Sequence, residues 1–111
     1  MKSEIKQRWI EALRSGEYKQ GKGRLHMGDE FCCLGVLCEI LDTPSVIHQA
    51  TGAKAYDGET AYLPYSVAQK CDLCDTRGGL VDSTTSLSQI NDRGNSFTTI
   101  ADIIEKNWKR L

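Results

Sequence analysis

Apolar residues recur at helical spacing at the start of the chain. Ile5, Trp9 and Leu13 lie four residues apart, so they share one face of a helix. We expect this helix to begin near Ser3, whose hydroxyl can cap the first turn, and to stop at Arg14-Ser15-Gly16. Glycine at that position can adopt the left-handed backbone that closes a helix.

The end of the chain shows the clearest helical pattern. Its apolar positions form one continuous stripe, and Ser96 precedes them as an N-cap. The stripe consists of Phe97, Ile100, Ala101, Ile104, Trp108 and Leu111. The pattern predicts a C-terminal helix that packs one face against the core.

The most apolar run, FCCLGVLCEIL at residues 31–41, holds three of the five cysteines. Its apolar positions recur at three and four residues, which predicts a helix from Cys32 to about Leu41 that Pro44 ends. Free cysteine packs as a small hydrophobe, so we interpret Cys33 and Cys38 as core residues. We expect Gly35 to mark a point where another backbone comes close.

Two polar, glycine-containing segments predict hairpins. In residues 18–31, Met27-Gly28-Asp29 offers a tight turn. In residues 45–63, Tyr56-Asp57-Gly58-Glu59 is a turn signal between Lys54-Ala55 and residues 60–63. Pro64 then suits the first turn of a short helix that runs to about Lys70.

Residues 71–82 are predicted to be a loop with a short strand at Leu80-Val81. Thr84 or Thr85 is expected to cap a helical turn that residues 91–94 interrupt. The whole pattern predicts one α+β domain over residues 1–111. A small antiparallel sheet from two hairpins would pack against N-terminal, central and C-terminal helices.

Charge and composition narrow the function classes. The 14 Lys and Arg residues balance 15 Asp and Glu residues, so the net charge of -1 gives no general attraction to a nucleic acid polymer. No apolar run is long enough for a membrane span, and MKSEIKQRW lacks the apolar centre of a signal peptide. With an odd number of cysteines, these features predict a soluble cytoplasmic protein without membrane contact.

Two cysteine arrangements resemble known chemical sites. Cys71-x-x-Cys74 together with Cys32 and Cys33 would supply four thiolates for zinc, but adjacent helical residues point about 100° apart. The sequence does not favour a redox role for Cys71-x-x-Cys74. Acidic residues beside these cysteines are expected to raise the pKa of the thiols and so disfavour the reactive thiolate. We therefore predict no metal and no cofactor.

Histidines offer no convincing catalytic set. His26 precedes the buried cysteines and could pair with Cys32, but its sequence neighbours supply no orienting group. His48 is the other histidine. The sequence favours a binding protein over an enzyme.

Groups suited to a small anionic ligand are better represented. Tyr18, Gln20 and Arg24 lie in a glycine-rich segment whose amides are expected to be accessible. Asn91 and Arg93 precede the last helix, whose N-terminus favours phosphate; the alternative is a capped turn with local hydrogen bonds only. Arg77, followed by Gly78-Gly79, is a third candidate of this kind.

Four stretches resemble a set of small phage and prophage proteins that share their order. They are WIEALRSGEYKQ, FCCLGVLCEIL, the Leu63-Pro64 pair and LSQINDRGNSFTTIADIIE. The resemblance covers most of the chain, and residues 43–62 match least. Within this set, the chain is similar to the first-described anti-Thoeris sponge family, in which phage proteins sequester cyclic ADP-ribose isomers made by bacterial defence enzymes.

The resemblance implies an α+β subunit assembled into homodimers or homohexamers, with a cyclic nucleotide enclosed between subunits. Family ligand contacts include an asparagine, arginines and an aromatic residue. Asn91 matches that asparagine and Arg110 is a candidate arginine, whereas residues 80–90 contain no aromatic. The expected function is therefore sequestration without cleavage in the cytoplasm of an infected bacterium. The alternatives are a phosphodiesterase that uses His26 or His48, and a protein-binding inhibitor or zinc-stabilised interaction module.

Overall fold

The computed structural model describes residues 1–81 and 83–111. The order of elements is α1 (Ser3–Arg14), β1 (Lys19–Gln20), β2 (His26–Met27), β3 (Glu30–Phe31), α2 (Cys33–Ile40), β4 (Ser45–Ile47), β5 (Lys54–Tyr56), α3 (Tyr65–Cys71), α4 (Leu87–Asp92), α5 (Phe97–Asn107) and the 3₁₀ turn η1 (Trp108–Arg110). Helices and two small sheets occupy different parts of the chain, which confirms the α+β class.

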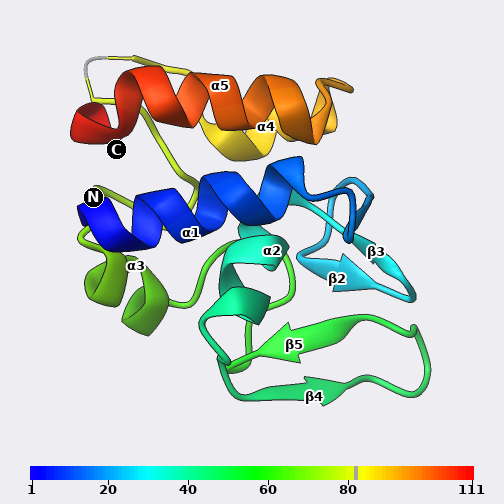
Figure 1. Cartoon of the computed structure of the whole chain (residues 1–111). Helices are drawn as coiled ribbons and strands as arrows, with labels where there is room; N and C mark the ends of the chain where they lie inside the picture. The colour runs from blue at the N-terminus through cyan, green and yellow to red at the C-terminus, as the bar shows by residue number, and fades with distance from the viewer. Residues whose placement is uncertain (82) are drawn as a thin grey trace.

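Helix α1 runs through the middle of the molecule. It lies between α4 and α5 on one side and α2 and α3 on the other (Figure 1). Its buried face carries Trp9, Ile10 and Leu13, and the indole Nε1 of Trp9 donates a hydrogen bond to the Cys33 carbonyl at 2.9 Å. Ser3 does not cap the helix as predicted: the N-cap position is Lys2, without a side-chain bond.

Helix α2 is the buried centre of the fold. Its residues from Cys33 to Cys38 are all buried, as the cysteine-rich run predicted. A Cβ atom at Gly35 would overlap the Leu25 carbonyl, so glycine is required for the two backbones to approach this closely. At the other end, the guanidinium of Arg8 donates to the Ile40 carbonyl at 2.6 Å and satisfies a free carbonyl of the last turn.

The first predicted hairpin is confirmed. Strands β2 and β3 pair antiparallel, with His26 opposite Phe31 and Met27 opposite Glu30. Strand β1 joins them by pairing parallel with β3, so the sheet order is β1-β3-β2. This parallel partner was not predicted, because a two-residue strand leaves no hydrophobic alternation in the sequence.

The second predicted hairpin was wrong in its pairing. Strand β5 pairs with the preceding β4, not with residues 60–63. The Tyr56–Glu59 turn exists, but it forms one isolated backbone bridge rather than a strand pair. All three residues of β4 are exposed, including the apolar Val46 and Ile47, so the strand lacks the alternation of a half-buried one.

The remaining connections correct two further predictions. Helix α3 begins after Pro64, as expected, and Cys71 is its last residue rather than part of a loop. Helix α4 is capped by Ser86, which forms a reciprocal capping box with Gln89, and not by Thr84 or Thr85.

The loop prediction for residues 71–82 is only partly met. Leu80 and Val81 do not form a strand; the bridge in this region joins Gly79 and Ser86. Residue 82 lies outside the described residues.

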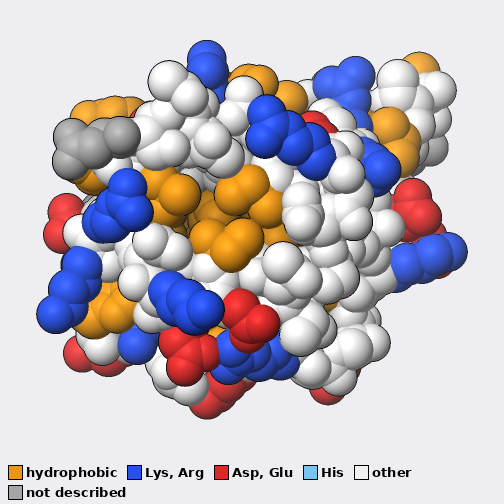
Figure 2. Space-filling view, turned by 90° about the horizontal axis from the view of Figure 1, so that it is seen from above, with side chains coloured by type: hydrophobic (Ala, Val, Ile, Leu, Met, Phe, Trp, Pro, Cys, Tyr) orange, Lys and Arg blue, Asp and Glu red, His pale blue; other side chains and the backbone are white. Residues whose placement is uncertain are grey.

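Helix α5 confirms the apolar stripe and its cap. Ser96 accepts a hydrogen bond from the Thr99 amide at 3.2 Å, and Phe97, Ile100 and Ile104 are buried. The face seen from above in Figure 2 carries a central group of apolar side chains, with Lys and Arg side chains scattered around it and Asp and Glu side chains below it. In the part of the chain that the structure describes, no helix is long and apolar enough to span a membrane.

Candidate functional site

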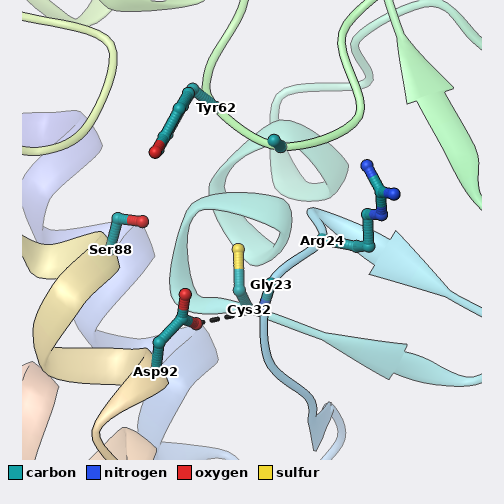
Figure 3. Close-up of a pocket in the computed structure, with 7 residues that line it drawn as sticks. Gly23, Arg24, Cys32, Tyr62, Ser88 and Asp92 are labelled. Carbon is teal, nitrogen blue, oxygen red and sulfur yellow. Dashed lines mark hydrogen bonds between the residues drawn. The ribbon is translucent and has the colours of Figure 1, made fainter.

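A polar hollow opens where four parts of the chain meet. The β1–β2 connection, the start of α2, the segment before α3, and α4 together form its walls (Figure 3). It encloses about 40 Å³. Its lining consists of Gly23, Arg24, Cys32, Ala61, Tyr62, Ser88 and Asp92.

The side chain of Asn91, on α4, links that wall of the hollow to β1 and to the start of α2. Its side chain is fully buried, and its Oδ1 accepts from Gln20 Nε2 at 2.9 Å and from the Cys33 amide at 3.2 Å. Its Nδ2 donates to the Gly21 carbonyl at 2.8 Å and to Asp92 Oδ1 at 3.2 Å. Asn91 therefore uses its hydrogen-bonding capacity within the fold and fixes α4 against β1 and α2.

Gln20 is engaged in the same network. Its Nε2 also donates to the Asn95 carbonyl at 2.7 Å. Asn95 in turn donates from Nδ2 to the Ile90 carbonyl at 2.9 Å, a local bond of the capped-turn kind. The two predicted ligand residues Gln20 and Asn91 are thus brought together, but as a support behind the hollow rather than as part of its lining.

The side chains that face the hollow have fewer hydrogen-bond partners within the fold than Asn91 and Gln20 have. Asp92 accepts from the Gly23 amide at 3.0 Å and from Asn91, in both cases through Oδ1. Among the described residues, its Oδ2 and the hydroxyls of Tyr62 and Ser88 have no hydrogen-bond partner. Tyr62, Ser88, Asp92 and Cys32 point towards one common space (Figure 3). The hollow therefore offers acceptors and hydroxyls that solvent or a ligand can use.

Two of the predicted arginines lie beside this space. Arg24 lines the hollow, and its Nη1 donates to the Thr60 hydroxyl at 3.3 Å. The guanidinium of Arg77 lies over the ring of Tyr62, 5.3 Å from its centroid, in a cation–π contact. Tyr62 is 42% exposed, so its ring still presents an accessible apolar surface beside the Arg77 guanidinium.

Cys32 forms part of the hollow but is a poor nucleophile. Its residue is only 4% exposed, and burial raises the pKa of its thiol to about 11. Because the thiolate is the reactive form, Cys32 is protonated and inert near neutral pH. Cys33, Cys38 and Cys71 are also buried, whereas Cys74 is exposed. Residues 1–81 and 83–111 contain no group of three or more His, Cys, Asp or Glu side chains that could hold a metal ion.

His26 belongs to a separate half-buried network. Tyr56 donates its hydroxyl proton to Glu39 Oε2 at 2.6 Å, and His26 Nδ1 lies 3.0 Å from the Tyr56 oxygen. Because that proton is committed to Glu39, His26 must donate from Nδ1. Lys54 Nζ lies 3.5 Å from the same carboxylate oxygen.

The pKa values in this network follow from burial and hydrogen bonding. Burial and then the charge of Lys54 lower the pKa of His26. Burial and the Glu39 bond raise the pKa of Tyr56. Burial opposes ionisation of Glu39, but bonds from Tyr56 and Lys54 lower its pKa overall. None of these side chains lines the hollow, and His26 is not paired with Cys32.

The other predicted ligand residues lie apart from the hollow. Tyr18 packs edge-on against Phe31, with ring centroids 5.2 Å apart, and lines a different hollow beside Glu11 and Glu17. Arg93 is exposed while Asn91 is buried, so the two are not presented to solvent together. Arg110 donates to Asn107 Oδ1 at 3.2 Å and to the Val81 carbonyl at 3.0 Å.

Two larger hollows suit an anionic ligand less well. One, of about 340 Å³, has Arg8 as its cation, but this guanidinium already bonds the Ile40 carbonyl beside two glutamates. The other, of about 430 Å³ beside β4, is lined mainly by apolar and small groups with Asp57. The second has no Phe, Tyr or Trp ring in its lining, and in the first the ring of Tyr18 is half-buried against Phe31, whereas the ring of Tyr62 is exposed.

Sequence reasoning missed Tyr62 and Ser88, and it considered Asp92 only as part of the interruption at residues 91–94. These residues are separated along the chain and meet only through tertiary packing. The one signal in the sequence was the predicted interruption at residues 91–94, where Gly94, two residues after Asp92, has a left-handed backbone.

Comparisons with known proteins place the chain in one family. No curated protein and no solved structure matches it. A family model described as a domain of unknown function (DUF8296) matches residues 1–108, nearly the whole chain. The protein therefore belongs to the DUF8296 family.

Proposed function

We propose that this protein is a phage-encoded sponge that binds a cyclic nucleotide signal of bacterial defence and does not cleave it. The ligand class is a cyclic ADP-ribose isomer or a cyclic di- or trinucleotide. The observation that carries the proposal is the arrangement of Arg77, the exposed ring of Tyr62 and Arg24 at one hollow. Guanidinium groups bind phosphate through charge-assisted bonds, and an aromatic ring stacks on a base.

The chemistry of the hollow supports binding rather than cleavage. Its thiol, Cys32, is protonated near neutral pH because burial raises its pKa to about 11. His26 has its Nδ1 bound to Tyr56, outside the hollow. A sponge needs neither a nucleophile nor a general base, but it needs donors for phosphates and a surface for the base.

The size of the hollow supports assembly with a second copy. A space of about 40 Å³ holds a few waters or one small group, and a cyclic nucleotide is much larger. The rest of the ligand would lie across Tyr62, where a second chain could cover it. Closure between two chains would suit the high affinity that a stoichiometric trap requires. Our expectation of a homodimer or homohexamer rests on this argument and on the resemblance.

Titration calorimetry with cyclic ADP-ribose isomers and cyclic di- and trinucleotides tests this proposal. We expect binding, and recovery of the intact nucleotide after the complex is heat-denatured. Arg77→Ala and Tyr62→Ala should each weaken binding about tenfold or more, because they remove a charged contact and a stacking surface. Lys106→Ala is the matched control, since it removes an exposed cation on α5 and should leave affinity unchanged.

The rival functions give different results in the same assay. A phosphodiesterase would return cleaved products. A protein-binding inhibitor would bind none of the nucleotides, and this outcome from a folded sample would reject the sponge.

A further inference from the structure

The hollow carries charges of both signs. Arg24 belongs to its lining and Arg77 lies over the ring of Tyr62, while Asp92 directs a carboxylate towards the space that the side chains share (Figure 3). A phosphate placed inside would be repelled by this carboxylate at short range. A hydroxyl group is suited to the same place, because a carboxylate oxygen accepts its proton in a strong charge-assisted bond.

The polar atoms inside the hollow complete a set for hydroxyl recognition. Asp92 Oδ2 is an acceptor, and the hydroxyls of Ser88 and Tyr62 can each donate or accept. Among the described residues, none of these three atoms has a partner. All three side chains point into the hollow (Figure 3). Two neighbouring hydroxyls on one sugar ring could therefore bond at the same time.

The position of Asp92 is fixed before any ligand arrives. Its Oδ1 is held by the Gly23 amide and by Asn91, which is itself fully buried. Binding would therefore cost little side-chain ordering at this carboxylate. The volume of about 40 Å³ accommodates hydroxyl groups but not a base.

We propose that Asp92, Ser88 and Tyr62 form a subsite for the vicinal hydroxyls of a ribose, and that this subsite selects ribose over deoxyribose. The inference rests on the proposed function for the identity of the whole ligand, and within that class it favours a cyclic ADP-ribose isomer, because a ribose joined to phosphate through its 2′ or 3′ oxygen has no free vicinal pair. The sugar hydroxyls enter the hollow, and the attached phosphate remains outside near Arg24. A site built to bond a hydroxyl discriminates against an analogue that lacks it, because its own polar groups then lose their partner.

Sugar phosphates test the subsite without the rest of the nucleotide. The amide resonances of the full-length protein would be followed during titration with ribose 5-phosphate and with 2-deoxyribose 5-phosphate. We expect ribose 5-phosphate to shift the amides of Gly23, Ser88 and Asp92 with about tenfold higher affinity than its deoxy analogue. Equal affinities, or no shift at these amides, would overturn the inference.

Variants test whether the side chains of Asp92 and Ser88 cause the preference for ribose over deoxyribose. Asp92→Asn should reduce the affinity for ribose 5-phosphate to about that of the deoxy analogue, and Ser88→Ala should have a smaller effect in the same direction. Asp72→Asn is the matched control, since it removes an exposed carboxylate at the left-handed C-cap of α3, where asparagine is well tolerated. A ribose preference that persists in Asp92→Asn would also overturn the inference.

The two proposals fail separately. A ribose preference without any cyclic nucleotide binding would keep the subsite and reject the sponge. Cyclic nucleotide binding with equal affinity for both sugar phosphates would keep the sponge and reject the subsite.

Discussion

Two neighbouring regions of this protein treat polar groups in opposite ways. In the α2 scaffold, which we define as residues 32–38 with Asn91, the side-chain oxygen and nitrogen of Asn91 both have partners. Residues 32–38 are all buried, and Cys32 is the one that also borders the hollow. In the hollow, Asp92, Ser88 and Tyr62 direct polar atoms towards open space. Asn91 and Asp92 are adjacent in sequence, so a single step along α4 separates the two regions.

The difference separates residues that maintain the fold from residues available for binding. A buried amide whose bonds are all satisfied stabilises the structure, because breaking them would leave several groups unpaired in a dry interior. Partially exposed groups without partners contribute little to folding. Changes in the scaffold should therefore alter stability, and changes in the hollow should alter binding.

The largest expected difference concerns alkaline pH. Burial raises the thiol pKa of Cys32 to about 11 and raises those of Cys33 and Cys38 as well. Below about pH 8.5, both folded and unfolded chains keep these thiols protonated. Above that pH only the unfolded state releases the protons, so stability falls with a slope that approaches about 1.4 kcal/mol per pH unit for each thiol.

Chemical denaturation between pH 8 and pH 10.5 would measure this slope. Cys38→Ala should make the slope shallower by about 1.4 kcal/mol per pH unit, which is the contribution of one buried thiol. Cys74→Ser, at an exposed position, should leave the slope unchanged. A free energy of unfolding that stays constant up to pH 10.5 would contradict the burial of the scaffold thiols.

The intermediate effect is the loss of the Asn91 network. Asn91→Ala should lower the free energy of unfolding by about 3 kcal/mol, because it leaves the Cys33 amide and the Gly21 carbonyl without their side-chain partner. Urea denaturation would measure the loss. The matched control is Asn107→Ala, which removes one bond, to the Ile103 carbonyl within α5, and should cost about 1 kcal/mol or less. Equal losses of unfolding free energy in the two variants would show that the Asn91 side chain does not join α4 to β1 and α2.

The smallest effect on stability is expected in the hollow itself. Ser88→Ala should change the free energy of unfolding by less than about 0.5 kcal/mol, since its hydroxyl has no partner among the described residues. Ser86→Ala, two residues earlier, removes the cap of α4 and should cost about 1 kcal/mol. Thermal melting of the two variants side by side checks this order, and a reversed order would contradict the distinction between the regions.

The helices were largely predictable because their signals are local or periodic. The apolar stripe of α5, the Ser96 cap and the buried cysteines of α2 follow from spacing and residue type. Even the close approach at Gly35 was expected, although the Leu25 carbonyl as its partner was not. Periodicity identifies which face of a helix is buried, but not what covers it.

The hollow could not be predicted, because it depends on contacts between distant segments. Ser88 and Cys32 meet across the fold, and nothing in either local sequence indicates the other. Asn91 was predicted to bind a ligand from its polar neighbours, whereas its surroundings in three dimensions engage it fully. Short strands were not predicted for a related reason. The three residues of β4 are too few to show an alternation that would identify the strand or its pairing partner.

The single exposed thiol among the five cysteines has a practical consequence. A maleimide dye should attach at Cys74 in the native protein without any cysteine being replaced, because the other four thiols are buried. Cys74 lies three residues before Arg77, the guanidinium that covers the Tyr62 ring. A change in dye fluorescence on adding a nucleotide would then make this cysteine a built-in reporter of whatever displaces or orders that arginine.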